Sequence, residues 1–384
     1  MKKYFERLLG KRRGIIPGSI SVPTVLNRTI DAAVAIALVA AMVVIYRLDQ
    51  RIDVVTQVTP KPQTVSKPLT MAVTTPPEFD DMGKLLISLG KGYDTFDTIS
   101  VENLDDVTRL KKYDVLFLTC RTNMPKLLPK LKLALRDYVS SGGTLYASDL
   151  WYPLIADTFI EFAVPNWPVS GKKQEVTAEV VDPGLRDVLG SELQLKFELD
   201  YWMPAAFAGD TLTTIVRGRY TSTKDESLEA PLLVKFPLKK GIVIFTSFHN
   251  ASQNDESERK LLRYLVFMAA TAGEDAKITE TIASGGFSPK KQNILTASSD
   301  NPSVTQTYQS TKGGRLKFAL GFANRGARLR LTIKGPDGRT VVEKEGPETF
   351  FHEIVNAPIG EWICTVTALE VPYANFPFQL TIAE

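Results

Sequence analysis

From residue 69 onward, short apolar runs alternate with segments that have the spacing of amphipathic helices. The strand-like runs are "LTMAVTT", "YDVLFLTC", "TLYAS" and "KGIVIFTSFHN". The helix-like segments are "FDDMGKLLISLG", "VENLDDVTRLKK", "MPKLLPKLKLALRDYVSSGG" and "DESERKLLRYLVFMAATAG". A further short strand is expected near Ile99. Because the strands are apolar almost throughout, the alternation predicts a parallel sheet that is covered by helices on both faces.

The pattern changes twice in the rest of the chain. Residues 151–240 contain strand-like pieces such as "TLTTIVRGRY" without the regular alternation, and we expect them to elaborate one edge of the sheet. Residues 276–304 are rich in Ser, Gly, Thr and Asn, which predicts a linker. Residues 305–384 hold short strands separated by turns such as "GPDG", which predicts a small antiparallel β-sandwich.

The N-terminal part has a different character. Residues 32–46, "AAVAIALVAAMVVIY", form an apolar run without charge. As a helix this run is roughly 22 Å long, shorter than a hydrocarbon core of roughly 30 Å. Neighbouring residues and a snorkelling Arg47 make up most of the difference. Residues 30–47 are therefore predicted to form a transmembrane helix, with a cleaved signal peptide or a buried core helix as the alternatives.

Charge sets the predicted orientation of this helix. Residues 1–29 are basic, so the positive-inside rule keeps them in the cytoplasm and places the remainder outside it. The expected location is the cytoplasmic membrane, with one span and with periplasmic or extracellular C-terminal domains. Ala33, Ala37 and Ala41 recur every four residues, a spacing that would allow close contact between two such helices.

These patterns together divide the chain into six segments. They are a basic segment 1–29, the transmembrane helix 30–47, a Pro-rich spacer 48–68, an α/β domain 69–275, the linker 276–304 and the β-sandwich 305–384.

Composition narrows the chemistry. The net charge of +3 over 384 residues gives no indication of a nucleic-acid surface. The chain has two cysteines, Cys120 and Cys364, and two histidines, His249 and His352, with no zinc-type spacing among them. We expect neither a metal nor a cofactor. Both cysteines are predicted to be small buried residues, and His352 to lie on the surface of the sandwich.

The stretch "GGTLYASDLWYP" carries the candidate catalytic chemistry. A strand that turns sharply into a helix is where several hydrolase families place a nucleophile, because the turn exposes that side chain. Here the turn holds Ser148 and Asp149, and "KGIVIFTSFHN" ends near His249. Parallel strands bring these three residues to the same edge of the sheet.

The order of these segments resembles the class I glutamine amidotransferase-like fold, and most closely its ThuA-like branch. "YDVLFLTC", a long helix, "SGGTLYAS" and the late "KKGIVIFTSFHN" carry the resemblance, which covers roughly residues 69–273. It implies a flavodoxin-like parallel sheet. The tail, with "GPDGR" and "APIGEWICTVTA", resembles the pre-peptidase C-terminal type of β-sandwich, an accessory domain of exported proteins.

The resemblance also implies that the family's catalytic machinery is incomplete. Active members have a cysteine at the elbow, in a G-x-C-x-G pattern, and a His-x-Glu pair. Here Ser148 and Asp149 stand at the elbow, His249 matches the family's histidine, and Ala251 stands where the glutamate would be. The sequence therefore favours a pseudoenzyme. A Ser–His hydrolase remains open, with Ser148 as nucleophile, His249 as base and Asp255 or Glu256 orienting it.

The function predicted first is a membrane-anchored, non-catalytic module that binds a partner protein or an envelope glycan outside the cytoplasm. The alternative is an envelope hydrolase that uses Ser148 and His249. Aromatic residues near the carboxyl edge of the sheet could provide a ligand surface, or could simply be part of the core. They are Trp151, Tyr152, Trp167 and Trp202, together with Tyr201.

Overall fold

The computed structural model describes residues 69–121, 129–166, 168–249, 256–323 and 326–384. The segments 1–29, 30–47 and 48–68, including the predicted transmembrane helix with Ala33, Ala37 and Ala41, lie outside the described residues. Among the helices of the described ranges, none combines the length and apolar character that a membrane span requires.

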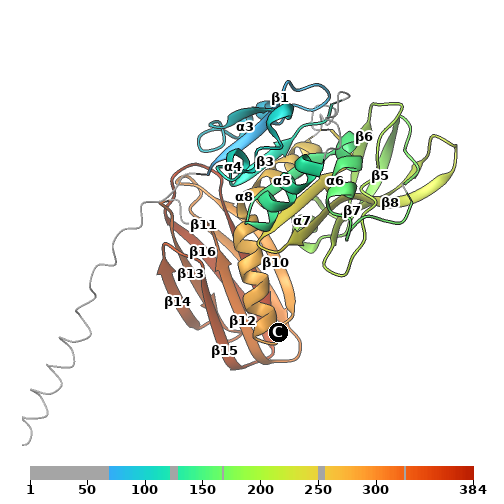
Figure 1. The fold of residues 1–384 in the computed structure, drawn as a ribbon. Coiled ribbons are helices and arrows are strands. Elements are labelled where there is room, and N and C mark those ends of the chain that lie inside the picture. The colour runs from blue at the N-terminus through green and yellow to red at the C-terminus, as the bar shows by residue number, and fades with distance from the viewer. Residues whose placement is uncertain (1–68, 122–128, 167, 250–255, 324–325) are drawn as a thin grey trace, which may run out of the picture. The chain divides into compact units, whose positions relative to one another are not determined.

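The described chain contains a nine-stranded mixed sheet whose first five strands are parallel (Figure 1). Their order, β2-β1-β3-β4-β9, is that of the flavodoxin-like doubly wound fold. This result confirms the predicted parallel α/β sheet. The five strands are β1 (Met71–Thr75), β2 (Asp97–Ser100), β3 (Val115–Leu118), β4 (Thr144–Ser148) and β9 (Gly241–Thr246).

Four antiparallel strands extend the sheet beyond β9, in the order β8-β7-β5-β6. They are β5 (Gln174–Val180), β6 (Glu192–Phe197), β7 (Thr213–Thr221) and β8 (Ser227–Leu238). In β5 and β6 every second residue is buried, the pattern of strands with one face against a core. The extension is the elaboration of the sheet edge that the irregular segment 151–240 predicts.

Helices cover both faces of the sheet. They are α3 (Met82–Leu89), α4 (Val107–Leu110), α5 (Pro129–Ser140), α6 (Tyr152–Thr158), α7 (Pro183–Leu189) and α8 (Glu256–Ser284), with 3-10 turns η1 (Val101–Asn103) and η2 (Asp149–Trp151). Asp81, Asp106 and Asp182 precede α3, α4 and α7, and each side chain accepts a hydrogen bond from a backbone N–H of the first turn. Such N-caps explain where these helices begin. The predicted helix "VENLDDVTRLKK" is thus realised as η1 and one turn of α4.

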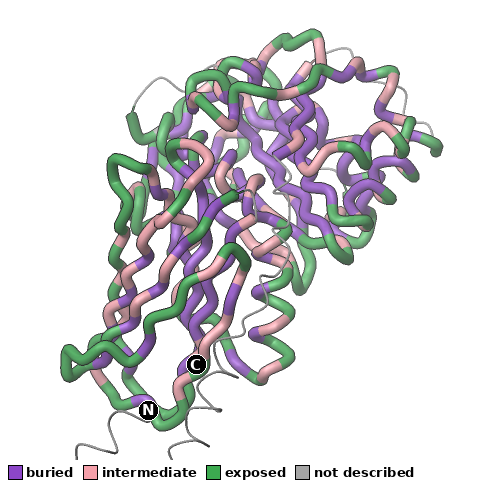
Figure 2. Tube along the Cα trace, turned by 90° about the vertical axis from the view of Figure 1, so that its left-hand side faces the viewer, coloured by how far each residue is buried: buried purple, intermediate pink, exposed green. Residues whose placement is uncertain are grey.

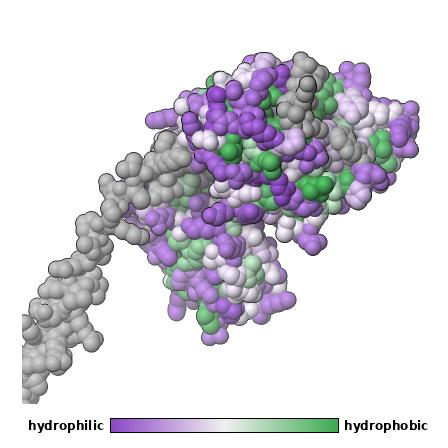
Figure 3. All heavy atoms as spheres, viewed as in Figure 1, coloured by the Kyte–Doolittle hydropathy of each residue, from purple (hydrophilic) through white to green (hydrophobic). Residues whose placement is uncertain are grey.

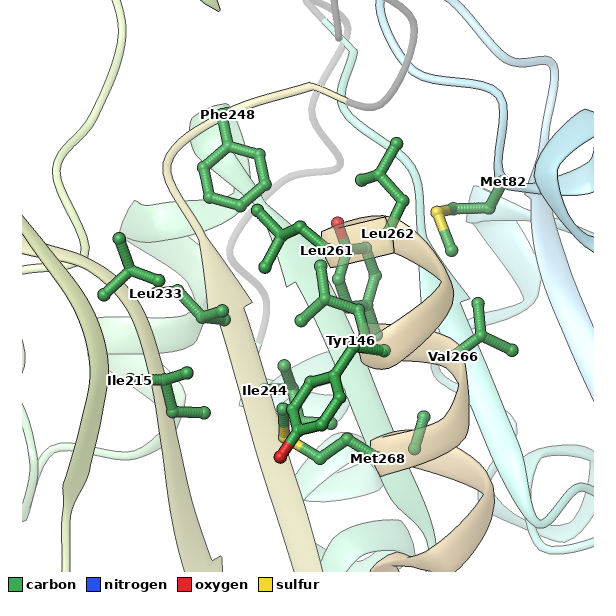
Figure 4. Packing of buried hydrophobic residues seen from close by; sticks show 14 of the residues in the cluster. Met82, Tyr146, Ile215, Leu233, Ile244, Phe248, Leu261, Leu262, Val266 and Met268 are labelled. Atoms are coloured by element: carbon green, nitrogen blue, oxygen red, sulfur yellow. The ribbon is translucent and has the colours of Figure 1, made fainter. Parts of the chain in front are cut away.

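The strands are apolar throughout because their side chains alternate between two cores. One core lies under α3, α7 and α8, and the other lies under α4, α5 and α6. Figure 4 shows α8 against the first face, where Leu261 and Met268 lie near Tyr146 and Ile244 of the central strands. Buried residues accordingly concentrate in the strands and on the inner sides of the helices (Figure 2).

The C-terminal β region consists of two four-stranded antiparallel sheets, β10-β17-β12-β15 and β11-β16-β13-β14. Its strands are β10 (Pro289–Ala297), β11 (Ser303–Ser310), β12 (Gly314–Gly321), β13 (Arg328–Lys334), β14 (Thr340–Gly346), β15 (Phe350–Ala357), β16 (Gly360–Glu370) and β17 (Phe376–Ala383). Residues of both sheets contribute to one hydrophobic cluster. The antiparallel character of residues 305–384 agrees with the prediction.

Residues 276–304 differ from the predicted linker. The helix α8 continues to Ser284, and β10 follows from Pro289. The helix continues because Ile278 and Ile282, four residues apart, are both buried against the β region. A segment rich in small polar residues can therefore still be helical when two apolar side chains lie on one face of it.

A buried charged network joins the α/β sheet to the β region. The carboxylate of Asp275, on α8, lies 3.0 Å from the ammonium of Lys235 on β8. It also accepts hydrogen bonds from Gln379 on β17, at 3.0 Å, and from Gln292 on β10. Burial alone would raise the pKa of Asp275, but the Lys235 charge and these hydrogen bonds hold it below its ordinary value. Because four elements share the carboxylate, α8 is tied to both parts.

Exposed large apolar residues are single and dispersed over the described chain. They are Ile87, Leu133, Ile160, Val188, Tyr201, Val341, Val355 and Ile359. On the face drawn in Figure 3, apolar residues form small separate groups among polar ones. Dispersed apolar side chains of this kind are ordinary for a folded protein.

Removing the buried cation should destabilise the protein far more than removing an exposed one. We expect Lys235→Met to lower the free energy of unfolding by about 3–5 kcal/mol, because Asp275 would keep a buried charge without its partner. Lys111→Met, in an exposed pair with Asp137, should cost about 1 kcal/mol or less. Chemical denaturation of the purified full-length variants measures both. Equal losses would show that Asp275 does not depend on Lys235.

Candidate functional site

The elbow at the end of β4 is occupied by Asp149. Its backbone has φ +46°, in the left-handed region that few residues other than glycine adopt, aspartate being one of the more tolerant. Ser148, one residue earlier, has φ −132° and is still extended. The strained position of the strand-to-helix turn, where related architectures hold a nucleophile, therefore carries a carboxylate in this chain.

The imidazole of His249 lies between two carboxylates. Its Nε2 is 2.8 Å from Oδ2 of Asp149, and its Nδ1 is 2.9 Å from Oε1 of Glu198. Asp149 is completely buried, His249 is 3% exposed and the Glu198 side chain is 30% exposed. The three residues come from the ends of β4, β9 and β6, so the parallel core of the sheet and its antiparallel extension meet here.

Three further groups contact Asp149 or His249. Oδ1 of Asp149 accepts a hydrogen bond of 2.6 Å from the backbone N–H of Met203. The thiol of Cys120, just after β3, lies 3.9 Å from Oδ2 of Asp149. The ring of Phe79 stacks on the imidazole, with centroids 5.9 Å apart and an interplanar angle of 14°. The carboxylate is therefore fixed at both oxygens.

The surroundings raise the pKa values of three groups in the site, His249, Asp149 and Cys120. Burial alone would lower the pKa of His249, but its hydrogen bonds to Asp149, Cys120 and Glu198 outweigh burial and raise it. Burial raises the pKa of Asp149 above its ordinary value, against the opposing effect of His249. Burial also raises the pKa of Cys120 to about 11. At neutral pH the thiol is thus protonated, and the imidazole carries a positive charge between the carboxylates.

The site is enclosed. In the described part of the chain, the space beside the imidazole has no room for a molecule the size of water. It is lined by Asp149, Phe197, Glu198, Leu199, Trp202, Ser247, Phe248 and His249. In this conformation the side chains of Asp149 and His249 are at most 3% exposed, so neither is open to a substrate.

The predicted Ser148–His249 pair does not form. The hydroxyl of Ser148 donates to Oδ2 of Asp80 at 3.2 Å, while both nitrogens of His249 face carboxylates. Of the two predicted orienting residues, Asp255 lies outside the described residues, and Glu256 is exposed at the start of α8. The expected proximity of His249 and Asp149 at one edge of the sheet is confirmed, and the pair is buried.

Glu198 was not predicted from the sequence. It lies beside the histidine, although it stands 51 positions before His249 in the sequence. Its one sequence indication is its place directly after the alternating strand β6, at the end of "ELQLKF". That local pattern does not indicate that the glutamate contacts His249.

Of the aromatic residues that could form a ligand surface or belong to the core, Trp151, Tyr152 and Trp202 lie in the core, whereas Tyr201 is exposed. Trp151, Tyr152 and Trp202 are at most 1% exposed. The indole N–H of Trp151 donates to the carbonyl of Thr119 at 2.8 Å, and Trp202 stacks on Phe197 at 3.9 Å. Their polar tips are satisfied by backbone carbonyls, so these large rings can be buried completely. Trp167 lies outside the described residues.

The remaining cysteine and histidine lie in the β region. Cys364 is buried in β16, where burial raises its pKa to about 12, in agreement with a buried packing role. His352 is partly exposed on β15, as predicted for a residue near the surface. Neither belongs to the site at the carboxyl edge of the parallel strands.

Comparison with known proteins gives structural likenesses only. No family model and no curated protein matches this chain. A ThuA-like protein from Bacteroides uniformis is 13% identical with a TM-score of 0.38, and the match covers 55% of this chain and 95% of that one. A ThuA-like protein from Parabacteroides merdae is 12% identical with a TM-score of 0.37, covering 53% and 90%.

A third likeness is to a GMP synthase component from Thermoplasma acidophilum, which is 15% identical with a TM-score of 0.35, covering 56% of this chain and 98% of that one. Because all three TM-scores lie below 0.5, these likenesses carry no argument about family or activity. The flavodoxin-like description rests on the strand order of the sheet itself.

Loss of the imidazole should destabilise the fold. We expect His249→Ala to lower the free energy of unfolding by about 3–5 kcal/mol, because it leaves the Asp149 carboxylate buried without its countercharge. His352→Ala, the matched change on β15, should cost about 1 kcal/mol or less, since that residue is partly exposed. Denaturant titrations of both variants test this. A small loss in His249→Ala would mean that the pair is not buried as described.

Proposed function

We propose that the protein is a non-catalytic, membrane-anchored module that binds a partner protein or an envelope glycan outside the cytoplasm. The observation that carries the non-catalytic part is the occupied elbow. Asp149 holds the strained position there, and it is paired with His249 in an enclosed site.

Each group of the site that could act as a nucleophile is engaged or protonated. The oxygens of Asp149 contact Met203 and His249, and the hydroxyl of Ser148 donates to Asp80. The thiol of Cys120 has a pKa raised to about 11, so at neutral pH very little of the reactive thiolate is present.

The imidazole is not available as a general base either. His249 could accept a proton only at a ring nitrogen with an available lone pair, and both of its nitrogens face carboxylates. The imidazolium is stabilised in this setting, which is the reverse of what a base needs at neutral pH. His249 therefore forms a buried ion pair with Asp149 and Glu198. This pair holds the residues that follow β6 against the ends of β4 and β9.

The anchor and the accessory domain support a role in the envelope. The apolar run within residues 30–47 and the basic segment before it favour one membrane span with an inside N-terminus. The resemblance of the C-terminal region to pre-peptidase C-terminal sandwiches agrees with export. As part of the same proposal, we place the α/β domain in the amidotransferase-like, ThuA-like group. We do not transfer any catalytic activity of that group to this protein, because fold does not determine function.

A covalent probe tests the absence of catalysis. We expect a fluorophosphonate to label neither the purified full-length protein nor its Ser148→Ala variant, because the hydroxyl is buried and donates to Asp80 instead of pairing with His249. A serine hydrolase added to the same reaction is the positive control. Labelling of the wild type that disappears in a folded Ser148→Ala protein would establish the rival function, a hydrolase of the envelope.

Reporter fusions test the topology separately. Alkaline phosphatase fused after residue 384 should be active, because the enzyme folds only where disulfides form, and a cytoplasm-dependent fluorescent reporter at the same site should be dark. The opposite pair of results would contradict the location. A mature protein that begins near residue 48 would show that the apolar run is a cleaved signal peptide.

A further inference from the structure

Three side chains of the types that bind transition metals converge at the carboxyl edge of the parallel strands. Cys120 follows β3, Asp149 follows β4 and His249 follows β9. The possible ligand atoms of the three residues all lie within 4.8 Å of one another, and all three residues are buried. In the strand order β3-β4-β9 they come from adjacent strands, so the scaffold that places them is the rigid centre of the sheet.

We propose that Cys120, Asp149 and His249 form a binding site for a divalent cation of the zinc class. This inference goes beyond the proposed function, since it assigns a ligand to the enclosed cluster and gives that cluster a structural role. Sulfur, nitrogen and a carboxylate oxygen are the donors that zinc takes in proteins. Calcium and magnesium are excluded as the preferred ions, because they require mainly oxygen ligands.

The donor separations are close to those of a tetrahedral ion. With zinc bonds of about 2.0 Å to nitrogen and oxygen and about 2.3 Å to sulfur, tetrahedral angles give edges of about 3.3 Å for N–O and about 3.5 Å for S–O. The separations here are 2.8 Å between Nε2 of His249 and Oδ2 of Asp149, and 3.9 Å between the thiol of Cys120 and the same oxygen. Shifts of about half an ångström would seat the ion.

The surrounding contacts orient two of the three ligands in the manner of known zinc sites. Glu198 lies at the Nδ1 of His249, which leaves Nε2 as the nitrogen directed at Asp149 and Cys120. Metal-binding histidines usually give their other ring N–H to a carboxylate in this way. The backbone N–H of Met203 holds Oδ1 of Asp149, so that Oδ2 is the oxygen that faces the cluster.

The enclosure that excludes a substrate does not exclude an ion. The space beside the imidazole is too small for a molecule the size of water before an ion binds. A zinc ion replaces two protons, spreads its three ligands slightly and takes one further donor, such as a water, at its fourth position. Binding converts the thiol of Cys120 to a thiolate and the imidazolium of His249 to imidazole, so two protons leave the site. The two positive charges of the ion then balance the negative charges of the thiolate and the Asp149 carboxylate, so neither anion is buried without a countercharge.

The chain supplies its own matched controls, because it has only two cysteines and two histidines. Purified full-length protein is equilibrated with zinc, freed of excess ion and assayed for metal by mass spectrometry. We expect about one ion per chain in the wild type, in Cys364→Ser and in His352→Gln. The ion should be lost in Cys120→Ser and in His249→Gln. Glu198→Gln should bind zinc about 10–100-fold more weakly, as removal of an outer partner does.

Cobalt substitution identifies the ligands independently of stability. The Co2+ protein should show a thiolate-to-metal charge-transfer band in the near ultraviolet that is present in Cys364→Ser and absent in Cys120→Ser. Added zinc should raise the melting temperature of the wild type but not that of Cys120→Ser, which keeps nearly the shape of the native side chain. That variant therefore decides the matter even if His249→Gln fails to fold.

Two results would overturn the metal site. One is a wild-type protein that retains no zinc and shows no thiolate–cobalt band, and the other is equal zinc content in wild type and Cys120→Ser. Either result would leave the proposed non-catalytic function standing, because that proposal is tested by the fluorophosphonate and by the fusions. Conversely, a labelled Ser148 would refute the proposed function without removing the metal ligands.

Discussion

The structure at the carboxyl edge of the parallel strands depends on one buried interaction, the pairing of His249 with Asp149 and Glu198. The imidazole lies 2.8 Å and 2.9 Å from its two carboxylates. A buried aspartate at a strained φ of +46° would be costly alone, because both its charge and its backbone are unfavourable there. The imidazolium supplies the countercharge, so this contact offsets the cost of burying the Asp149 charge and occupies the carboxylate at the elbow.

A second buried charge has a related effect elsewhere in the described chain. Asp275 gathers Lys235 and two glutamines from three different strands, which ties α8 to the α/β sheet and to the β region. In both places a carboxylate is held by several elements that are far apart in sequence. Such networks add little to net stability compared with an apolar core, but they are costly to break and so favour one arrangement of the parts.

Sequence periodicity predicted the parallel strands because burial on both faces leaves a nearly continuous apolar run, as in "VLFL" of β3. It also placed Asp149 and His249 at one edge, since that follows from strand direction alone. It could not place Glu198, whose position depends on how the antiparallel strands pair beyond β9.

The linker was mispredicted because residue type alone does not distinguish a polar helix from a loop. The distinction depends on what Ile278 and Ile282 contact in the folded protein. Trp151 and Trp202 were open to two interpretations for the same reason, since carbonyl partners of an indole are set by the tertiary fold.

The central claim is that the catalytic position is closed and chemically inactive, and the reactivity of Cys120 tests it most directly. The thiol lies within the cluster and is buried, and burial raises its pKa to about 11. Cys364, the other cysteine, is also buried. Iodoacetamide should therefore modify neither cysteine in the native protein and both after unfolding, with the sites identified by mass spectrometry. Modification of Cys120 in folded protein, at a rate faster than global unfolding, would contradict the account, because it would show an open site that contains a reactive thiolate.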